Sequence, residues 1–243
     1  MKIIVTIIIL INCITITYSQ NIDTTKLCDN SDYELIPCKK NHYEPTRCRI
    51  TLNSGFAYIF SKASSDIPTE YKNYYDALRS GINYSGDATY YLTKNIGIGF
   101  KLLRSYSHNR MDNIVSIDED GNRHYGNKSD KLSISFIGPS ISSRFYHNEN
   151  IILANVSIGY IEYSNERVII ENYPITGYTF GLTYDLGYDF HICQNIYLGF
   201  QLSLISGFSY QFESGNSELL NIINTEFKSP LRFDISTGLR YYF

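Results

Sequence analysis

The last fifteen residues of the chain, 229–243, alternate between two sets of side chains. One set is mostly apolar and consists of Leu231, Phe233, Ile235, Thr237, Leu239, Tyr241 and Phe243. The other set is mostly polar and consists of Arg232, Asp234, Ser236, Gly238, Arg240 and Tyr242. A period of two predicts a β-strand with one apolar face and one polar face. This alternation limits the fold to sheets that have a different environment on each side.

Seven earlier segments show the same alternation. They cover 51–60, 81–92, a segment from Ile96, 131–146, 151–163, 176–190 and a segment from Ile196. Short turns at 93–95, 147–150 and 191–195 alternate with long polar stretches. No segment has a helical period, so we expect neither crossover helices nor parallel strands. The sequence therefore predicts eight antiparallel strands in up-and-down order, with the last strand paired to the first.

The segment 131–146 changes phase in its middle. Leu132, Ile134 and Phe136 set one apolar phase, whereas Ile141 and Phe145 follow the other. Gly138 and Pro139 lie between the two phases, and proline cannot donate a hydrogen bond to a regular ladder. We therefore expect a bulge or a bend at these two residues.

Length, charge and hydropathy exclude several classes of protein. The 243 residues carry a net charge of −3, which does not favour a nucleic-acid partner. The mean hydropathy of −0.20 would suit a protein in water. A transmembrane barrel gives the same average, because each of its strands combines an apolar and a polar face.

The first 50 residues are expected to lie outside the barrel. Residues 1–19 combine Lys2, an apolar run and small residues before a cleavage point, which is typical of a secretory signal peptide. Residues 20–50 are polar and lack a regular period, so we expect a short periplasmic extension. The barrel domain is then predicted to cover 51–243.

Four cysteines remain after removal of the signal peptide: Cys28, Cys38, Cys48 and Cys193. An even number of cysteines in an exported chain suggests disulfides, although four cysteines allow three connectivities. We hypothesise the pairs Cys28–Cys38 and Cys48–Cys193, because the topology places the second pair at the same rim of the barrel.

The size of the residues on the two faces predicts which face is outside. The interior of an eight-stranded barrel is only just wide enough for side chains. The apolar face carries Phe, Tyr, Leu and Ile at nearly every position, whereas the other face carries mostly Gly, Ser, Thr and Asn with scattered charges. The apolar face should therefore point outward, where only lipid accepts it.

The C-terminal strand carries a further motif, formed by Ser236, Gly238, Tyr241 and Phe243. With this motif, the signal peptide and eight alternating strands, the chain resembles small bacterial outer-membrane β-barrel proteins of the OmpA/OmpX-like type over roughly 51–243. The resemblance implies that these four residues are an assembly signal and that the barrel-assembly machinery inserts the chain. It also implies contact with outer-membrane lipid and lipopolysaccharide, periplasmic termini and extracellular long loops.

Several charged residues fall on the face that is expected to point into the lumen. They are Asp87, Lys101, Asp185, Asp189, Arg232, Asp234 and Arg240, with Arg144 as a further candidate. Since unpaired buried charges are costly, the near balance of signs predicts a network of ion pairs that fills the lumen. The alternative is an ion path or a catalytic carboxylate in this lumen.

The sequence leaves three functions to weigh. A structural or surface-interaction role without catalysis is expected first, with any ligand bound at 61–80, 108–130, 164–175 or 211–228, which are rich in Tyr and Asn. A narrow porin-like passage is the first alternative. A lipid A-modifying enzyme is the second, for which Ser105, Ser107, His108 and Asp112 are the candidate residues. No cofactor or metal motif is present, so we expect neither.

Overall fold

The computed structural model describes residues 46–60, 69–117, 123–169, 171–208, 211–214 and 231–243, which all belong to one compact unit, 44–243. The elements are β1 (Cys48–Ile59), α2 (Thr69–Leu78), β2 (Ser80–Tyr91), β3 (Ile96–Ile117), β4 (Arg123–His147), β5 (Asn150–Ile169), β6 (Glu171–Cys193), β7 (Ile196–Gly207), β8 (Gln211–Ser214) and β9 (Leu231–Tyr242). The expected signal peptide and most of the expected extension lie outside the described residues.

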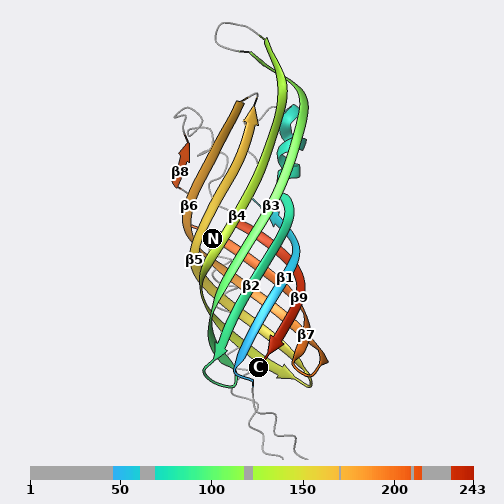
Figure 1. Cartoon of the computed structure of the whole chain (residues 1–243), viewed down its shortest axis with the longest axis vertical. Coiled ribbons are helices and arrows are strands. Elements are labelled where there is room, and N and C mark those ends of the chain that lie inside the picture. Colours follow the sequence, from blue (N-terminus) through green and yellow to red (C-terminus); the bar gives the residue numbers. More distant parts are fainter. Residues whose placement is uncertain (1–45, 61–68, 118–122, 170, 209–210, 215–230) are drawn as a thin grey trace, which may run out of the picture. The chain divides into compact units, whose positions relative to one another are not determined.

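The strands form one closed antiparallel barrel (Figure 1). Its order is β1-β2-β3-β4-β5-β6-β7-β9, and β9 pairs with β1 to complete the circle. The short β8 pairs with β6 next to the part of β6 that extends past β7. Each main strand thus lies beside its neighbour in the chain, and the predicted eight-stranded up-and-down barrel is confirmed.

The register fixes the width of the barrel. A path along paired residues from Arg49 runs once around all eight strands and returns to β1 at Ile59, ten residues beyond its start. Eight strands with this stagger tilt by roughly 35–45° and enclose a space that side chains alone can fill. The interior therefore has to be a packed core.

The outside of the barrel is apolar at the height of the short strands. Exposed side chains in this band include Leu52 (68%), Phe180 (63%), Phe56, Ile98, Phe100, Leu102, Ile158, Phe200, Ile235 and Leu239. Soluble monomers rarely expose a continuous apolar surface of this kind, and hydrocarbon is the solvent that suits it. The predicted outward orientation of the apolar face is confirmed, and the band is that of a transmembrane barrel.

Of the bulge or bend expected in β4, the register shows no bulge, although the pairing with β5 skips Gly138 and Pro139. Ile137 pairs with Tyr160 and Ser140 pairs with Ser157, so the register is the same on both sides of Gly138 and Pro139. Leu132, Ile134 and Phe136 are buried inside the barrel, whereas Pro139 is exposed on the outer face. The change of phase in the sequence therefore marks a change in the contents of the lumen, from polar to apolar, in a strand whose register does not shift.

Several predicted boundaries were too short. Strands β3, β4, β5 and β6 have 20 to 25 residues and extend well past their shorter neighbours (Figure 1). Much of the polar stretches 108–130 and 164–175 is therefore strand, and the stretch 61–80 contains α2, although no helix was expected. The first strand begins at Cys48, so the end of the expected extension belongs to the barrel wall. Where a strand lies outside lipid, both of its faces can be polar, and the sequence then lacks the apolar alternation that predicts a strand. These parts were therefore predicted as loops.

The apolar band makes a testable prediction. Replacement of Ile158 by Lys should destabilise the barrel by about 2–4 kcal/mol, because the ammonium group would enter hydrocarbon. The same replacement by Lys at Ser164 should change the stability by less than about 1 kcal/mol. Ser164 has the same outward orientation on β5 but lies beyond the band. Equilibrium unfolding in lipid vesicles measures both values. Equal effects of the two substitutions would contradict the position of the band.

Candidate functional site

The lumen is the part of the molecule where the charged side chains gather. All seven predicted charged residues lie on inward positions. Lys101, Asp185, Asp189, Arg232, Asp234 and Arg240 are at most 3% exposed, and the side chain of Asp87 is 8% exposed. Arg144, the further candidate, is completely buried. The structure thus brings all of these residues into one interior.

Two ion pairs occupy the middle of the lumen. The Lys101 Nζ atom lies 2.5 Å from Asp185 Oδ1, which joins β3 to β6 across the barrel. On β9, Arg232 forms a two-point contact with Asp234, with Nε–Oδ1 and Nη2–Oδ2 distances of 2.8 Å each. Geometry of this kind offsets part of the large cost of removing charges from water.

Two further pairs lie closer to the rim with the short turns. Arg240 Nε is 3.0 Å from Asp189 Oδ1, and the Tyr242 hydroxyl donates to Asp189 Oδ2 at 2.7 Å. Arg49 Nη2 lies 2.6 Å from Asp87 Oδ1. The sequence prediction missed Arg49, because it placed residue 49 in the extension. Its alternation with Ile50 and Thr51 was the signal that could have extended the strand.

Arg144 has a different environment, since its contacts are aromatic rings and carbonyl groups. The guanidinium carbon lies 3.5 Å from the centre of the Tyr91 ring. Its Nε donates to the Lys94 carbonyl at 2.8 Å, and Nη2 donates to the Thr46 carbonyl at 2.7 Å. A cation stacked on an aromatic face is stabilised by the ring quadrupole. Arg144 therefore ties the β2–β3 turn and the entry to β1 together at the end of the lumen.

The other half of the lumen is apolar. A cluster of buried side chains fills it, formed by Ile59, Leu103, Leu132, Ile134, Phe136, Ile161, Tyr163, Ile175 and Ile205. Phe136 is 2% exposed and Ile161 is completely buried. We call these nine residues the apolar plug. Close-packed apolar side chains leave little space for water, so the plug bears on whether a solute could pass through the barrel.

Above the plug, α2 contacts the inward face of the extended strands through Asp130. The Tyr74 hydroxyl donates to Asp130 Oδ2 at 2.7 Å, while Asn165 Nδ2 and Arg167 Nε donate to Oδ1 at 2.7 and 2.8 Å. Tyr74 is only 3% exposed, so this tyrosine holds the helix in place and is not part of a contact surface. Lys128 donates to the Tyr75 hydroxyl at 2.9 Å beside this cluster.

The Asp130 cluster lies beyond the apolar band, because the adjacent outward residues Lys131 and Glu166 are exposed and charged. Burial by itself would raise the pKa of Asp130, but Arg167, Tyr74 and Asn165 stabilise the carboxylate and lower this pKa below its usual value. Burial raises the pKa of Tyr74, and its hydrogen bond to Asp130 raises it further. Both groups therefore keep their hydrogen-bonded forms throughout the neutral range.

The candidate catalytic residues do not form a catalytic arrangement. Ser105 is buried, and its hydroxyl accepts a hydrogen bond from Arg232. Ser107 also points inward, whereas His108 is exposed on the opposite face of β3. Asp112 is exposed and pairs with Arg110 at 2.7 Å. A serine and a histidine on opposite faces of one strand cannot share a proton, because a general base has to lie within hydrogen-bond reach of its nucleophile.

The predicted Cys48–Cys193 disulfide is wrong, since both thiols are free. The two cysteines do lie at the same rim, but β9 and β7 separate β1 from β6. Strands are about 4.8 Å apart, so three such steps exceed the 7 Å that a disulfide can span between Cα atoms. Cys28 and Cys38 lie outside the described residues.

The described part of the chain contains no metal site, because no group of three His, Cys, Asp or Glu side chains in these ranges could hold an ion. Among the described helices, none has the length and apolar character that crossing a membrane requires.

The lumen pairs predict a specific pattern of stabilities. Lys101→Met should destabilise the barrel by about 3–5 kcal/mol, because it leaves the Asp185 carboxylate buried without its cation. The double variant Lys101→Met, Asp185→Leu should recover most of this loss, since an apolar pair of similar volume can replace a buried ion pair. Unfolding by guanidinium in vesicles provides the measurement. A control substitution, Lys131→Met, breaks the exposed pair with Glu166 and should cost less than about 1 kcal/mol.

A second prediction concerns the attachment of α2. Asp130→Ala should release the helix while the barrel stays folded, because it removes the acceptor of all three hydrogen bonds. Trypsin should then cut after the exposed Lys72 in intact vesicles. Asp112→Ala, which breaks an exposed pair with Arg110, should leave the helix protected. Cutting at the same rate in both variants would refute the role of Asp130.

The lowered pKa of Asp130 sets the sign of the pH dependence. The folded pKa lies below the usual value of 3.8, so the stabilisation is complete above that value and is lost as the pH falls through the folded pKa. The protection of α2 should therefore stay constant between pH 8 and about pH 5.

No family model and no curated protein sequence matches this chain. Solved structures do resemble it. A major outer membrane protein from Thermus thermophilus is 10% identical, with 81% of this chain and 99% of that chain covered and a TM-score of 0.48. OprG from Pseudomonas aeruginosa is 11% identical, with 82% and 97% covered and a TM-score of 0.46. Neisserial surface protein A is 12% identical, with 81% and 97% covered and a TM-score of 0.45. These similarities concern the barrel fold, which the strand pairing of this chain establishes independently.

Proposed function

We propose that this protein is a closed, non-catalytic barrel of the bacterial outer membrane with a structural or surface-interaction role. The observation that carries the proposal is the filled lumen. Paired charges occupy one half of it, and the apolar plug occupies the other. A barrel with this interior can stabilise a membrane and present its extended strands, but it has no continuous aqueous path.

The porin-like alternative requires water along the whole lumen. The plug opposes it, because ions do not enter a close-packed apolar zone without a large loss of hydration. The charged zone opposes it as well, since each of its four carboxylates already has a cation within 3.0 Å. A passage for solutes would have to break both zones.

The enzyme alternative has less support than the non-catalytic role. In the described residues, Ser105 is engaged by Arg232 and His108 lies on the other face of its strand. Fold alone does not decide between enzyme and non-enzyme, so the proposal rests on the geometry of these residues.

The proposed orientation places the rim with the short turns in the periplasm. Cys48 and Phe243 meet there through two backbone hydrogen bonds of 2.7 and 2.9 Å. The extended parts of β3–β6 would then project from the cell with α2 against them. Exposed residues of this projection, such as Tyr125 (72% exposed), would be available to an extracellular ligand. The stretches 61–80, 108–130, 164–175 and 211–228 remain the proposed ligand regions.

We also propose that Ser236, Gly238, Tyr241 and Phe243 act as the signal for the barrel-assembly machinery. In β9, Tyr241 and Phe243 point outward, whereas Ser236 points into the lumen. Gly238 pairs with Asn53, and a Cβ atom at this position would collide with the Leu52 carbonyl. Packing within the finished barrel therefore also requires this glycine. Outer-membrane lipid and lipopolysaccharide would surround the apolar band.

Conductance tests the closed lumen. The purified chain, inserted into a planar bilayer, should give no steady current, because the plug leaves no aqueous path. A heat-dependent shift on a gel verifies that the inserted protein is folded, and a wide porin in the same bilayer serves as the positive control. A steady current from the folded wild-type chain would overturn the proposal and favour the porin-like passage.

A further inference from the structure

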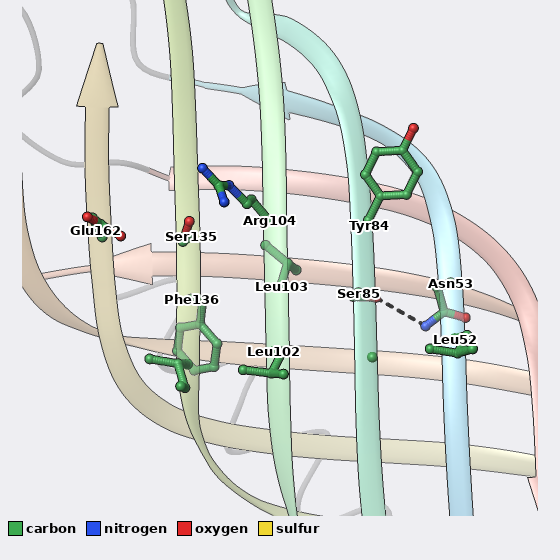
Figure 2. A pocket seen from close by; sticks show the side chains of 12 residues that line it. Leu52, Asn53, Tyr84, Ser85, Leu102, Leu103, Arg104, Ser135, Phe136 and Glu162 are labelled. Atoms are coloured by element: carbon green, nitrogen blue, oxygen red, sulfur yellow. Dashed lines mark hydrogen bonds between the residues drawn. The ribbon is translucent and has the colours of Figure 1, made fainter. Parts of the chain in front are cut away.

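The described outer wall of the barrel has a groove toward each end of the apolar band. Figure 2 shows the groove of about 670 Å³ toward the extended strands, where Arg104 already donates to the Ser133 hydroxyl at 3.2 Å. The other groove has a volume of about 1030 Å³, and Cys48 and Phe243 line it where it meets the rim with the short turns. We call this second groove the rim groove.

Small residues on the outer face create the rim groove. In the register, Ile50 pairs with Ala88, and Ala88 pairs with Phe100. Phe100 in turn pairs with Pro139. Bulky and small side chains alternate along this row, so the wall is lower at Ala88 and Pro139. Ile50, Phe100 and Ile141 border the groove and are each at least 46% exposed. Because the groove belongs to the apolar band, its occupant has to be apolar there.

Two exposed cations, Arg47 and Lys94, lie at the rim end of this groove. Arg47 directly precedes Cys48, which lines the groove. Arg144 holds both segments together, because it donates to the Lys94 carbonyl at 2.8 Å and to the Thr46 carbonyl at 2.7 Å. The two cations therefore lie on the same side of the rim, at the mouth of the groove.

Neither cation has an ion-pair partner among the described residues. Lys94 Nζ lies 5.9 Å from the centre of the Tyr146 ring, and this contact leaves the ammonium hydrogens able to donate. Glu149, an exposed carboxylate of this rim, lies 3.6 Å from the His191 ring. Phe243 lines the groove from the β9 side, and its main-chain oxygen accepts a backbone hydrogen bond from β1 at 2.7 Å. Two positive charges are thus available to a ligand at this mouth.

The charge of the mouth and the apolar wall of the groove together define the ligand. A guanidinium and an ammonium both donate to phosphate oxygens. A headgroup that carries its own ammonium would bring a further positive charge to the mouth, where like charges repel. The ligand that fits best therefore combines an acyl chain with a purely anionic headgroup.

We propose that the rim groove binds an anionic phospholipid whose headgroup carries a phosphate and no ammonium, as in phosphatidylglycerol. Arg47 and Lys94 bind the phosphate, and one acyl chain lies along Ala88 and Pro139. The proposal rests on the membrane location and the orientation in the proposed function, which place this mouth at the phospholipid leaflet that faces the periplasm. It adds a selected lipid at a defined place on the barrel wall.

Ala88 allows the acyl-chain part to be tested separately from the headgroup. Its side chain is exposed on the outer face, so Ala88→Leu should fold and fill the groove with an apolar group. Thr237→Leu is the matched control, because Thr237 is exposed on the outer face of β9 and does not line the groove.

The experiment measures lipid retention by the full chain with native mass spectrometry. The probes are phosphatidylglycerol, phosphatidylethanolamine and phosphatidylcholine with identical acyl chains. The wild-type chain should retain one phosphatidylglycerol about tenfold more strongly than either zwitterionic lipid, because only this headgroup lacks a cation. Arg47→Gln, Lys94→Gln and Ala88→Leu should each reduce the retention of phosphatidylglycerol about fivefold.

The matched charge controls are Arg110→Gln and Lys131→Gln, which make the same chemical changes toward the other end of β3 and β4. Both controls, and Thr237→Leu, should retain phosphatidylglycerol as the wild-type chain does. A heat-dependent gel shift verifies that each variant is folded. Equal retention of all three lipids, or unchanged retention in both Arg47→Gln and Lys94→Gln, would overturn the proposal. Unchanged retention in Ala88→Leu would overturn the placement of the acyl chain in the groove.

An exposed thiol separates a failure of this proposal from a failure of the proposed orientation. Cys193 is exposed at the same rim. In a variant that keeps Cys193 as its only cysteine, a maleimide polymer too large to cross the outer membrane should label the thiol only after this membrane is permeabilised. Labelling in intact cells would overturn the orientation and the leaflet, whatever the retention of lipids. If the chain instead folds as a monomer without detergent or lipid, the membrane location itself fails.

Discussion

The narrow interior of an eight-stranded barrel is the constraint on which this structure depends. A register that returns to β1 ten residues further along leaves space for side chains and little else. Every inward residue therefore has to be small, paired with another residue, or packed in an apolar cluster. The bulky side chains of the other face have no place in this interior, so they form the outer wall.

Under this constraint, the lumen divides into zones along its axis. Aromatic and aliphatic side chains close the rim with the short turns, and Arg144 stacks on Tyr91 there. The four ion pairs follow, and the apolar plug lies beyond them. A lumen with one polar zone could conduct ions if its charges were mobile. The succession of a paired zone and an apolar zone is the reason why a closed barrel is the better proposal.

The residue types on the outer surface change along the strands, because the surroundings change from lipid to water. Within the band, Leu102 and Ile158 face outward, and beyond it the same strands carry Arg104 and Glu162. Arg104, Ser135 and Glu162, which pair side by side on β3, β4 and β5, lie where this change occurs. Further out, Asp130 holds α2 against strands that lipid no longer supports.

The sequence was sufficient to predict the eight strands, their order and the lumen positions of seven charged residues. It failed where the apolar signal ends. The outer parts of β3–β6 were predicted as loops, α2 was not predicted, and the phase change in β4 was interpreted as a bulge or a bend. In each case the prediction used the residue types of one segment, without the residues that lie beside them on other strands. Leu132, Ile134 and Phe136 look like an outward face until the plug shows that apolar residues also fill the lumen.

What the sequence determined by itself is which side of each strand is inside, because a period of two fixes the faces and the small interior admits only one of them. Only the tertiary structure decided which residues of different strands pair with one another. Lys101 and Asp185 lie 84 positions apart in the chain, and only the register around the closed barrel brings their side chains to 2.5 Å. The same holds for Arg104, Ser135 and Glu162, which belong to three strands. A pattern within one strand contains no information on the stagger between strands, and the stagger determines which charges meet.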